Sequence, residues 1–153
     1  MESSHNRPNM GNCIGDALFE LKKLQDFLAE TSTPFLGKLL GKLVGSDTIP
    51  FILLTKNGIF EWEGIVYNEK KKSQECFTTS FFRIDSIEKG SSCAKLTILR
   101  PYNIHKEPAK LLCDVVKLEK TPICIEIDIS CFCGIQCLDT ELLKRKIICE
   151  PKW

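Results

Sequence analysis

The sequence predicts a mainly β fold: an antiparallel β-sandwich or barrel-like domain with an N-terminal amphipathic helix and a short C-terminal helical segment. Three observations lead to this prediction. Apolar residues near the N-terminus follow helical spacing, apolar and polar residues alternate in most runs from residue 49 onward, and turn-forming residues separate these runs. With 153 residues, the chain is long enough for one domain with a sizeable core.

The first predicted element is a helix that follows a polar segment, residues 1–12, which we expect to be disordered. Asn12 is a suitable N-cap, and the helix should end before Pro34, because a residue that precedes proline avoids helical geometry. The apolar residues of the helix recur at three- and four-residue spacing and therefore share one face. They are Ile14, Ala17, Leu18, Leu21, Leu24 and Leu28. We expect residues 13–153 to form a single cysteine-rich domain.

A glycine-containing segment, residues 35–45, follows the helix and repeats the unit Gly-Lys-Leu. Two interpretations are open: a membrane-active or partner-binding amphipathic turn, or a short helix that covers the core. Each interior glycine weakens a helix by roughly 1 kcal/mol, and we favour the short covering helix.

Strand-like patterns begin at residue 49 and are separated by polar links and turns. The predicted strands are 51–55, 59–67, 76–87, 93–99, 111–118 and 123–131. Asn57 and Gly58, between the first two strands, are a strong hairpin signal because both residue types tolerate positive φ. After Gly134 we expect residues 135–148 to form the short C-terminal helix, with basic residues near its negative end.

Composition argues against several classes of partner. The formal net charge is +1, so no strong electrostatic field attracts nucleic acid. No segment approaches the roughly 18 uninterrupted apolar residues of a membrane-spanning helix, and the N-terminus lacks the apolar region of a signal peptide. We therefore predict no nucleic-acid partner, no membrane partner, and synthesis in a reducing cytosol.

Nine cysteines are many for a protein made in a reducing compartment. They are Cys13, Cys76, Cys93, Cys113, Cys124, Cys131, Cys133, Cys137 and Cys149. Because nine is odd, complete pairing within one chain is impossible, and at least one thiol is free or bonds to another chain. Each is a candidate for a disulfide cross-link, a metal ligand or a buried core residue. For Cys93 and Cys113, a buried thiol and a cross-link are equally open.

The segment from Cys124 to Leu138, C-I-E-I-D-I-S-C-F-C-G-I-Q-C-L, holds four of these cysteines. Its first part alternates like a half-buried strand, with three isoleucines on one face and acidic residues on the other. If the strand continues, Cys131 and Cys133 fall on the isoleucine face and Phe132 falls on the acidic face. Thiols this dense on one element indicate either cross-linking or metal binding.

Catalysis and metal binding both lack their usual patterns. A cysteine nucleophile needs a base, and His105, in a polar loop, is the one credible candidate. The chain contains no C-x-x-C, the motif of zinc knuckles and thiol oxidoreductases. The thiolates that would enclose a zinc ion are those of Cys131, Cys133, Cys137 and Cys149. We predict no enzymatic activity and no cofactor, and keep a zinc-stabilised binding module as the alternative function.

A longer pattern runs from Lys117 to Leu138 and reads K-L-E-K-T-x-x-C-I-E-I-D-I-S-C-F-C-G-I-Q-C-L. Three further segments agree in order: D-T-I-P-F at 47–51, C-F-T-T-S-F-F-R at 76–83 and S-C-A-K-L at 92–96. Together they resemble the spore coat and exosporium protein family that includes CotY, CotZ and ExsY, and the L-E-K-T and C-F-x-T-x-F-F-R elements are most like its CotZ members. The chain departs from the family in two places. It has no cysteine in residues 31–44, and its tail from residue 139 is longer than expected.

The resemblance implies a structural, non-catalytic protein of endospore-forming bacteria, made in the mother-cell cytosol and deposited on the outer coat, crust or exosporium of the spore. Relatives assemble with themselves into ordered two-dimensional lattices and become disulfide cross-linked. The implied partners are copies of this chain, other proteins of the same family and morphogenetic coat proteins. Oxidation on the released spore accounts for abundant thiols in a chain without a signal peptide.

Overall fold

The computed structural model describes residues 13–29, 48–138 and 148–150 of the chain. Several predictions concern residues outside these ranges: the disorder of residues 1–12, the helix in residues 35–45, and the C-terminal helix beyond residue 138.

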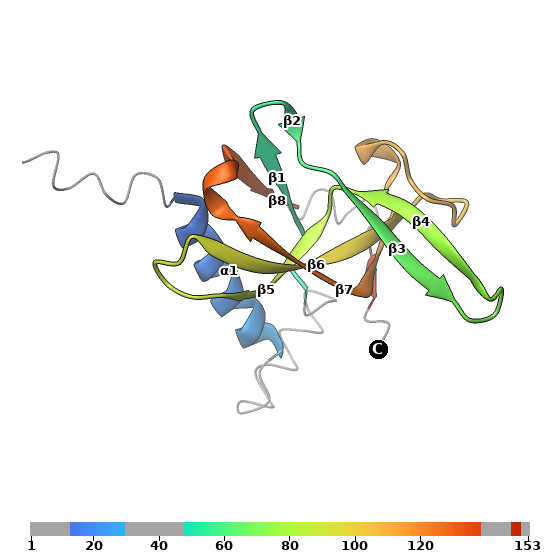
Figure 1. The fold of residues 1–153 in the computed structure, drawn as a ribbon, viewed down its shortest axis with the longest axis horizontal. Helices are drawn as coiled ribbons and strands as arrows, with labels where there is room; N and C mark the ends of the chain where they lie inside the picture. Colours follow the sequence, from blue (N-terminus) through green and yellow to red (C-terminus); the bar gives the residue numbers. More distant parts are fainter. Residues whose placement is uncertain (1–12, 30–47, 139–147, 151–153) are drawn as a thin grey trace, which may run out of the picture.

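The described residues form one helix and nine strands (Figure 1). These are α1 (Cys13–Ala29), β1 (Phe51–Thr55), β2 (Gly58–Ile59), β3 (Trp62–Asn68), β4 (Ser73–Thr79), β5 (Phe82–Ile87), β6 (Cys93–Tyr102), β7 (Lys117–Asp128), β8 (Gly134–Cys137) and β9 (Ile148–Glu150). Short 3-10 turns lie at Leu112–Asp114 and Ile129–Cys131.

Most strands belong to one sheet that curves into a half-barrel (Figure 1). Its strand order is β2-β1-β5-β6-β7-β9, and β8 pairs with β1. Phe51 pairs with Phe82 of β5 and with Cys137 of β8, so β5 and β8 lie on opposite sides of β1. All pairs are antiparallel except the parallel pair of β7 and β9. The prediction of a mainly antiparallel β protein with an N-terminal helix is confirmed.

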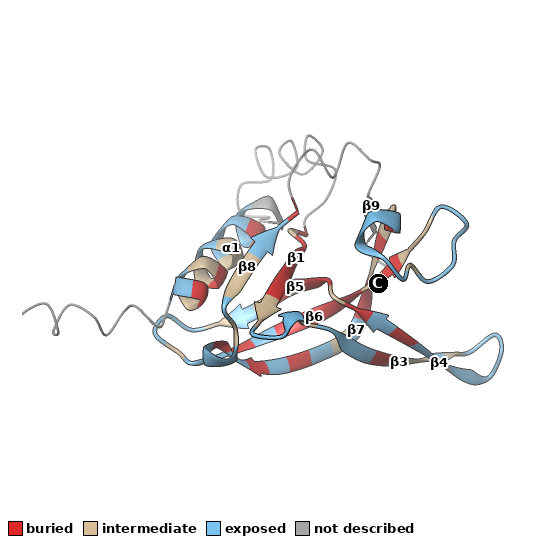
Figure 2. Cartoon of the chain, turned by 90° about the horizontal axis from the view of Figure 1, so that it is seen from above, coloured by how far each residue is buried: buried red, intermediate tan, exposed pale blue. Residues whose placement is uncertain are grey.

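Strands β3 and β4 form a separate two-stranded sheet, paired along seven residues each. This hairpin extends away from α1 at the other end of the molecule, and its tip is exposed (Figures 1 and 2). It packs on β6 through one face.

The predicted hairpin at Asn57-Gly58 is confirmed, with its turn shifted by one residue. Thr55 pairs with Gly58, so Lys56 and Asn57 occupy the turn. Gly58 has a φ of 122°, a conformation that favours glycine. The Thr55 hydroxyl donates to the Gly58 carbonyl and accepts from the Asn57 amide, which closes the turn.

The predicted strand 76–87 is interrupted between β4 and β5. The buried Thr79 hydroxyl accepts a hydrogen bond from the Phe81 amide and donates to the Leu99 carbonyl. These side-chain bonds take the place of a regular ladder of backbone hydrogen bonds. At Ser80 the chain turns away from the β3–β4 hairpin. The side chain of one threonine therefore divides what the sequence pattern presents as one strand.

The prediction of separate strands at 111–118 and 123–131 is wrong, because β7 is a single strand over Lys117–Asp128. Pro122 has no amide proton to donate to a ladder. The Thr121 hydroxyl compensates: it donates to the Ile98 carbonyl over 2.8 Å and accepts from the Ile123 amide. The β6–β7 register shifts between Thr97 and Leu99, so the irregularity is absorbed as a bulge and the strand continues.

The predicted C-terminal helix, residues 135–148, is wrong over its first residues and at its last, Ile148, which begins β9. Gly134–Cys137 is strand β8, paired in register with Leu54–Phe51 of β1. The Cys133 amide also donates to the Leu54 carbonyl over 2.7 Å, which starts this pairing. Competition from the open edge of β1 therefore prevails over local helix propensity.

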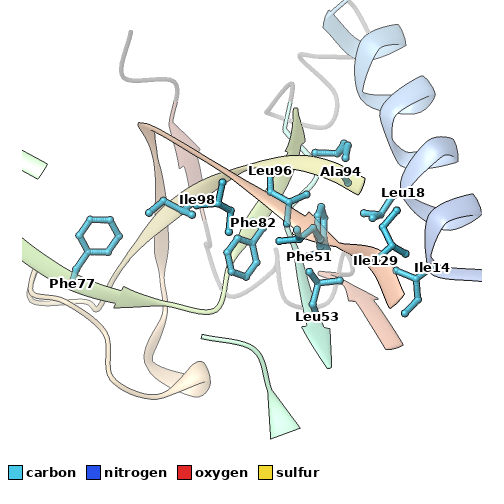
Figure 3. Packing of buried hydrophobic residues seen from close by; sticks show 13 residues of the cluster. Ile14, Leu18, Phe51, Leu53, Phe77, Phe82, Ala94, Leu96, Ile98 and Ile129 are labelled. Carbon is cyan, nitrogen blue, oxygen red and sulfur yellow. The ribbon is translucent and has the colours of Figure 1, made fainter. Parts of the chain in front are cut away.

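The main core lies between α1 and one face of the sheet (Figure 3). Its central aromatic residue, Phe82, is fully buried and packs between Phe51 and Phe60. The helix contributes Ile14 and Leu18, as its apolar spacing predicts. The other buried members are Leu53, Phe77, Ile84, Ala94, Leu96, Ile98, Ile125, Ile127 and Ile129.

Two residues of α1 differ from the predicted apolar face. Leu24, predicted to be on that face, is 52% exposed. Gln25, which the pattern treats as polar surface, is 2% exposed, and its amide nitrogen donates to the Ile84 carbonyl over 2.8 Å. Its carbonyl oxygen accepts from the Ile49 amide. Gln25 therefore anchors the helix to β5 and to the segment that precedes β1.

A second, smaller core lies on the other face of the sheet. It consists of Ile52, Phe81, Leu99, Val115, Leu118 and Leu138. Neighbouring residues of one strand, such as Phe51 and Ile52, enter different cores because successive side chains alternate across a strand. This explains why β1 reads as a continuous apolar run rather than an alternating one.

Candidate functional site

The candidate site residues are the cysteines, and all eight whose side chains are described are exposed. Cys13 begins α1, Cys76 lies on β4, Cys93 begins β6 and Cys124 lies on β7. Cys113 and Cys131 lie in the two 3-10 turns, Cys133 precedes β8, and Cys137 ends it. The interpretation of Cys93 and Cys113 as buried core residues is wrong. Cys149 lies on β9, and its side chain is outside the described residues.

The predicted faces hold through Ile129, which is buried in the main core, but they are wrong for residues 131–133. The strand ends at Asp128, whose carboxylate accepts hydrogen bonds from the Ser130 amide and hydroxyl and starts a 3-10 turn. The turn changes the period, so Phe132 points inward and meets the Phe60 ring at 5.0 Å between centroids. Cys131 and Cys133 are exposed rather than on the isoleucine face.

The four cysteines predicted as a possible zinc set come from different elements. Cys137 ends β8, which borders β1, whereas Cys149 lies on β9, which borders β7 at the other end of the strand order. Within residues 13–29, 48–138 and 148–150, no three His, Cys, Asp or Glu side chains gather as metal ligands. This geometry gives no support to a zinc-stabilised module.

The one candidate catalytic base is His105. His105 is exposed in the loop after β6, and its backbone amide donates to the Asn103 side chain. Among the described residues, no hydrogen bond joins the His105 ring to a cysteine, so no Cys–His pair is formed there.

Cys137 differs from an ordinary exposed thiol. It lies beside a groove between α1 and β8 that is also lined by Leu21, Leu24 and Ile135. Although the residue as a whole is exposed, partial burial of its sulfur raises the pKa of the thiol above its usual value of 9.0. Because the thiolate is the attacking form in disulfide exchange, Cys137 should react more slowly than an ordinary thiol at neutral pH.

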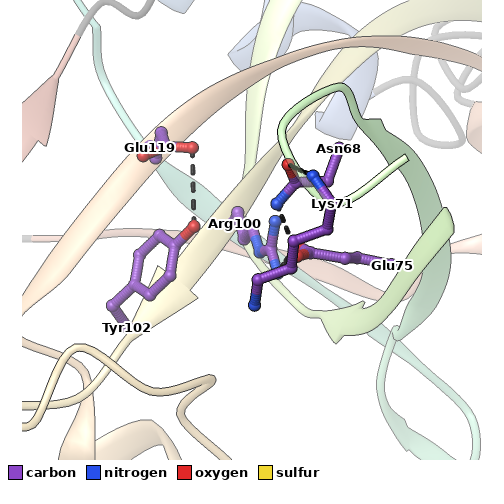
Figure 4. Close-up of polar contacts among 6 residues, drawn as sticks. All are labelled: Asn68, Lys71, Glu75, Arg100, Tyr102 and Glu119. Atoms are coloured by element: carbon purple, nitrogen blue, oxygen red, sulfur yellow. Dashed lines mark hydrogen bonds and ion pairs between the residues drawn. The ribbon is translucent and has the colours of Figure 1, made fainter. Parts of the chain in front are cut away.

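A cluster of polar side chains, the Arg100 clamp, fixes the β3–β4 hairpin to β6 (Figure 4). Arg100 Nη2 lies 3.0 Å from Glu75 Oε2, and Asn68 Nδ2 donates to Glu75 Oε1 over 2.8 Å. The Arg100 guanidinium also lies 5.0 Å from the centre of the Phe77 ring and 5.4 Å from that of Tyr102. The clamp therefore combines an ion pair with cation–π contacts and holds Cys76 of β4 in a defined place.

Glu75 makes this clamp sensitive to acid. The hydrogen bonds from Asn68 and then from Arg100 hold the pKa of the Glu75 carboxyl below its usual value of 4.5, against a smaller opposing effect of burial. A lowered folded-state pKa means that the carboxylate stabilises the fold above the unfolded-state pKa, and that this contribution is lost as pH falls through the folded-state pKa.

We therefore expect wild-type protein to be more stable than Glu75→Gln at neutral pH, and the difference to shrink as pH falls below 4.5 and through the lowered pKa of Glu75. Urea unfolding at a series of pH values measures this difference. Glu63→Gln, on the exposed face of the same hairpin, is the matched control. A wild-type advantage over E75Q that does not change with pH would contradict the role of Glu75.

In the described part of the chain, no helix combines the length and the apolar character needed to cross a membrane.

Comparisons with known proteins identify the family of the chain. The family model described as spore coat protein Z matches residues 1–140. Spore coat protein Z of Bacillus subtilis (strain 168) is 33% identical over 145 residues, which cover 88% of this chain and 93% of that protein. No solved structure matches the chain. The resemblance to the CotZ members is thereby confirmed, and the chain belongs to the spore coat protein Z family.

Proposed function

We propose that this protein is a self-assembling subunit of the outer coat, crust or exosporium basal layer of the spore, in a two-dimensional lattice reinforced by disulfides within and between subunits. Its family implies a structural, non-enzymatic role and a location in the spore coat. The observation that carries the rest of the proposal is that all eight cysteines with described side chains are exposed.

Exposure favours cross-linking over the other uses of these thiols. A buried cysteine packs as a small apolar residue and is inert, whereas an exposed one is accessible to a neighbouring chain. Seven of the eight thiols lie on α1, β4, β6, β7, β8 and the two 3-10 turns, and Cys133 directly precedes β8, so they are not confined to one element. Such a distribution suits a subunit with several neighbours, as a lattice requires.

Assembly in this proposal has two stages. Noncovalent contacts first arrange subunits, and several weak contacts for each subunit hold the layer before oxidation. Two thiols on adjacent chains then form one disulfide and release two protons, while their two electrons reduce molecular oxygen to hydrogen peroxide. The same disulfide formation can join this chain to other proteins. We propose that these partners are other coat proteins of the family and morphogenetic coat proteins.

The test compares oxidised and reduced purified protein. We expect ordered oligomers or sheets in negative-stain electron microscopy, and detergent-resistant bands after boiling that disappear with dithiothreitol. The control is a variant in which all nine cysteines are replaced by serine, which should fold, because the eight described side chains are exposed, and should give no covalent bands. A strict monomer in both redox states, or bands that persist in reductant, would contradict the proposal.

A further inference from the structure

The hairpin β3–β4 presents an exposed outer face, bordered beside Cys76 and Thr78 by the loop that follows β6. This outer face carries Glu63, Ile65 and Tyr67 from β3 and Gln74, Cys76 and Thr78 from β4, and all six residues are exposed. Ile65 is 56% exposed and Tyr67 is 61% exposed, which is high for side chains of this size. Ile65 pairs directly with Cys76, so an apolar side chain and a thiol lie next to each other at the middle of the face.

The opposite face of the hairpin packs closely against β6, so the outer face is held rigidly. A Cβ on Gly64 would lie 2.5 Å from Cζ of Phe77 and 2.7 Å from Cδ1 of Ile98, which shows how closely the strand approaches the core. The Arg100 clamp fixes the distal part of the same face through Glu75. A rigid surface loses little conformational entropy when it docks, and this favours association.

The charges of the hairpin are segregated along its length. Its base begins with Glu61 and Glu63, whereas the tip, residues 69–72, contains three lysines and one glutamate. When two such hairpins lie antiparallel, the acidic base of each is opposite the basic tip of the other. With a rise of about 3.3 Å per residue, Glu61 and the tip are each roughly 13–17 Å from Ile65, on opposite sides of it. A two-fold axis close to Ile65 and Cys76 therefore matches opposite charges at both ends.

We propose that the outer face of β3–β4 docks on the same face of a second copy of this chain around such a two-fold axis. This inference rests on the proposed function and assigns one of its interfaces. The axis brings Cys76 of each subunit together. The two thiols then form one disulfide, with loss of two protons and transfer of two electrons to molecular oxygen, which becomes hydrogen peroxide. The face of one hairpin is small beside the roughly 800 Å² that each partner buries in a stable interface, so the contact is weak until oxidation locks it.

The test uses proteins that each retain one cysteine, the other eight being replaced by serine. We expect the Cys76-only protein to form a covalent dimer in air at least about tenfold faster than a Cys124-only control, because docking raises the effective concentration of the Cys76 thiols. Cys124 is a matched control because it is also exposed and also lies on a strand, where its cross-strand partner is the polar Thr97 rather than an exposed isoleucine.

Charge reversal tests the antiparallel arrangement. Replacing Lys70, Lys71 and Lys72 by glutamate in the Cys76-only protein should slow dimer formation toward the rate of the control. Adding Glu61→Lys and Glu63→Lys should restore it, an outcome that loss of folding cannot produce. Equal rates for the two single-cysteine proteins, or no rescue by the second reversal, would overturn the inference. Reductant-sensitive oligomers of wild-type protein in the same experiment would show that the proposed function survives that result.

Discussion

The substitution Phe82→Ala should lower the free energy of unfolding by about 3–5 kcal/mol, the usual cost of truncating a buried aromatic side chain. Phe82 is fully buried, and its ring centre lies 5.4 Å from that of Phe60 and 6.5 Å from that of Phe51. It joins β5 to β1 and to the segment after β2, so the cavity would open at the junction of three elements. Because a domain of this kind has a total stability of about 5–15 kcal/mol, the loss is a large fraction of the whole.

Chemical denaturation of the cysteine-free variant measures this effect without interference from oxidation. Ile104→Ala is the control, because Ile104 is 76% exposed and its truncation should change stability by less than about 0.5 kcal/mol. Equal effects of F82A and I104A would show that Phe82 does not occupy the centre of the core.

Gly64→Val should destabilise the protein by about 1–3 kcal/mol or more, and should act mainly on the hairpin. The first added carbon would already lie within 3 Å of Phe77 and Ile98, and the branched side chain of valine adds two further methyl groups in the same place. The added volume forces the hairpin away from β6. We expect faster amide exchange across β3 and β4, while β6 and β7 retain their protection.

Glu63→Val is the matched control, since it adds the same residue type to the exposed face of the same strand. It should leave both stability and amide exchange nearly unchanged. Gly64→Ala should fall between wild type and G64V. Uniformly increased exchange in all strands after G64V would mean that the hairpin and the main sheet unfold as one unit, contrary to this prediction.

Local sequence patterns correctly predicted the elements whose buried side chains recur at regular helix or strand spacing. The spacing of Ile14 and Leu18 identified the buried face of α1, and Ile125 and Ile127 alternate into the core as predicted. The pattern failed where a side chain replaces a backbone hydrogen bond. The Thr79 and Thr121 hydroxyls, respectively, break one predicted strand and join two others, and nothing in the alternation of apolar residues reports a hydroxyl aimed at a carbonyl.

The placement of the candidate site was harder to predict than the fold. The strand period assigned Cys131 and Cys133 to the core face, but the carboxylate of Asp128 ends the strand and redirects both. The D-x-S spacing of Asp128 and Ser130 is a known local turn signal, and it is the sequence feature that predicts the end of the strand here. Cys76 was predicted as a cross-link candidate without an assigned face, and the partners of the hairpin face depend on long-range packing that no local pattern contains.

In disulfide-rich proteins, the same disulfides usually cross-link the chain and stabilise its fold. The exposure of the thiols separates cross-linking from fold stability in this protein. In small secreted domains, disulfides stabilise the fold itself, and reduction unfolds the chain. Here none of the eight described cysteine side chains belongs to either core. Under the proposed function, reduction would therefore separate the layer into intact, folded subunits. These subunits could assemble again after reoxidation, so the covalent layer would be reversible.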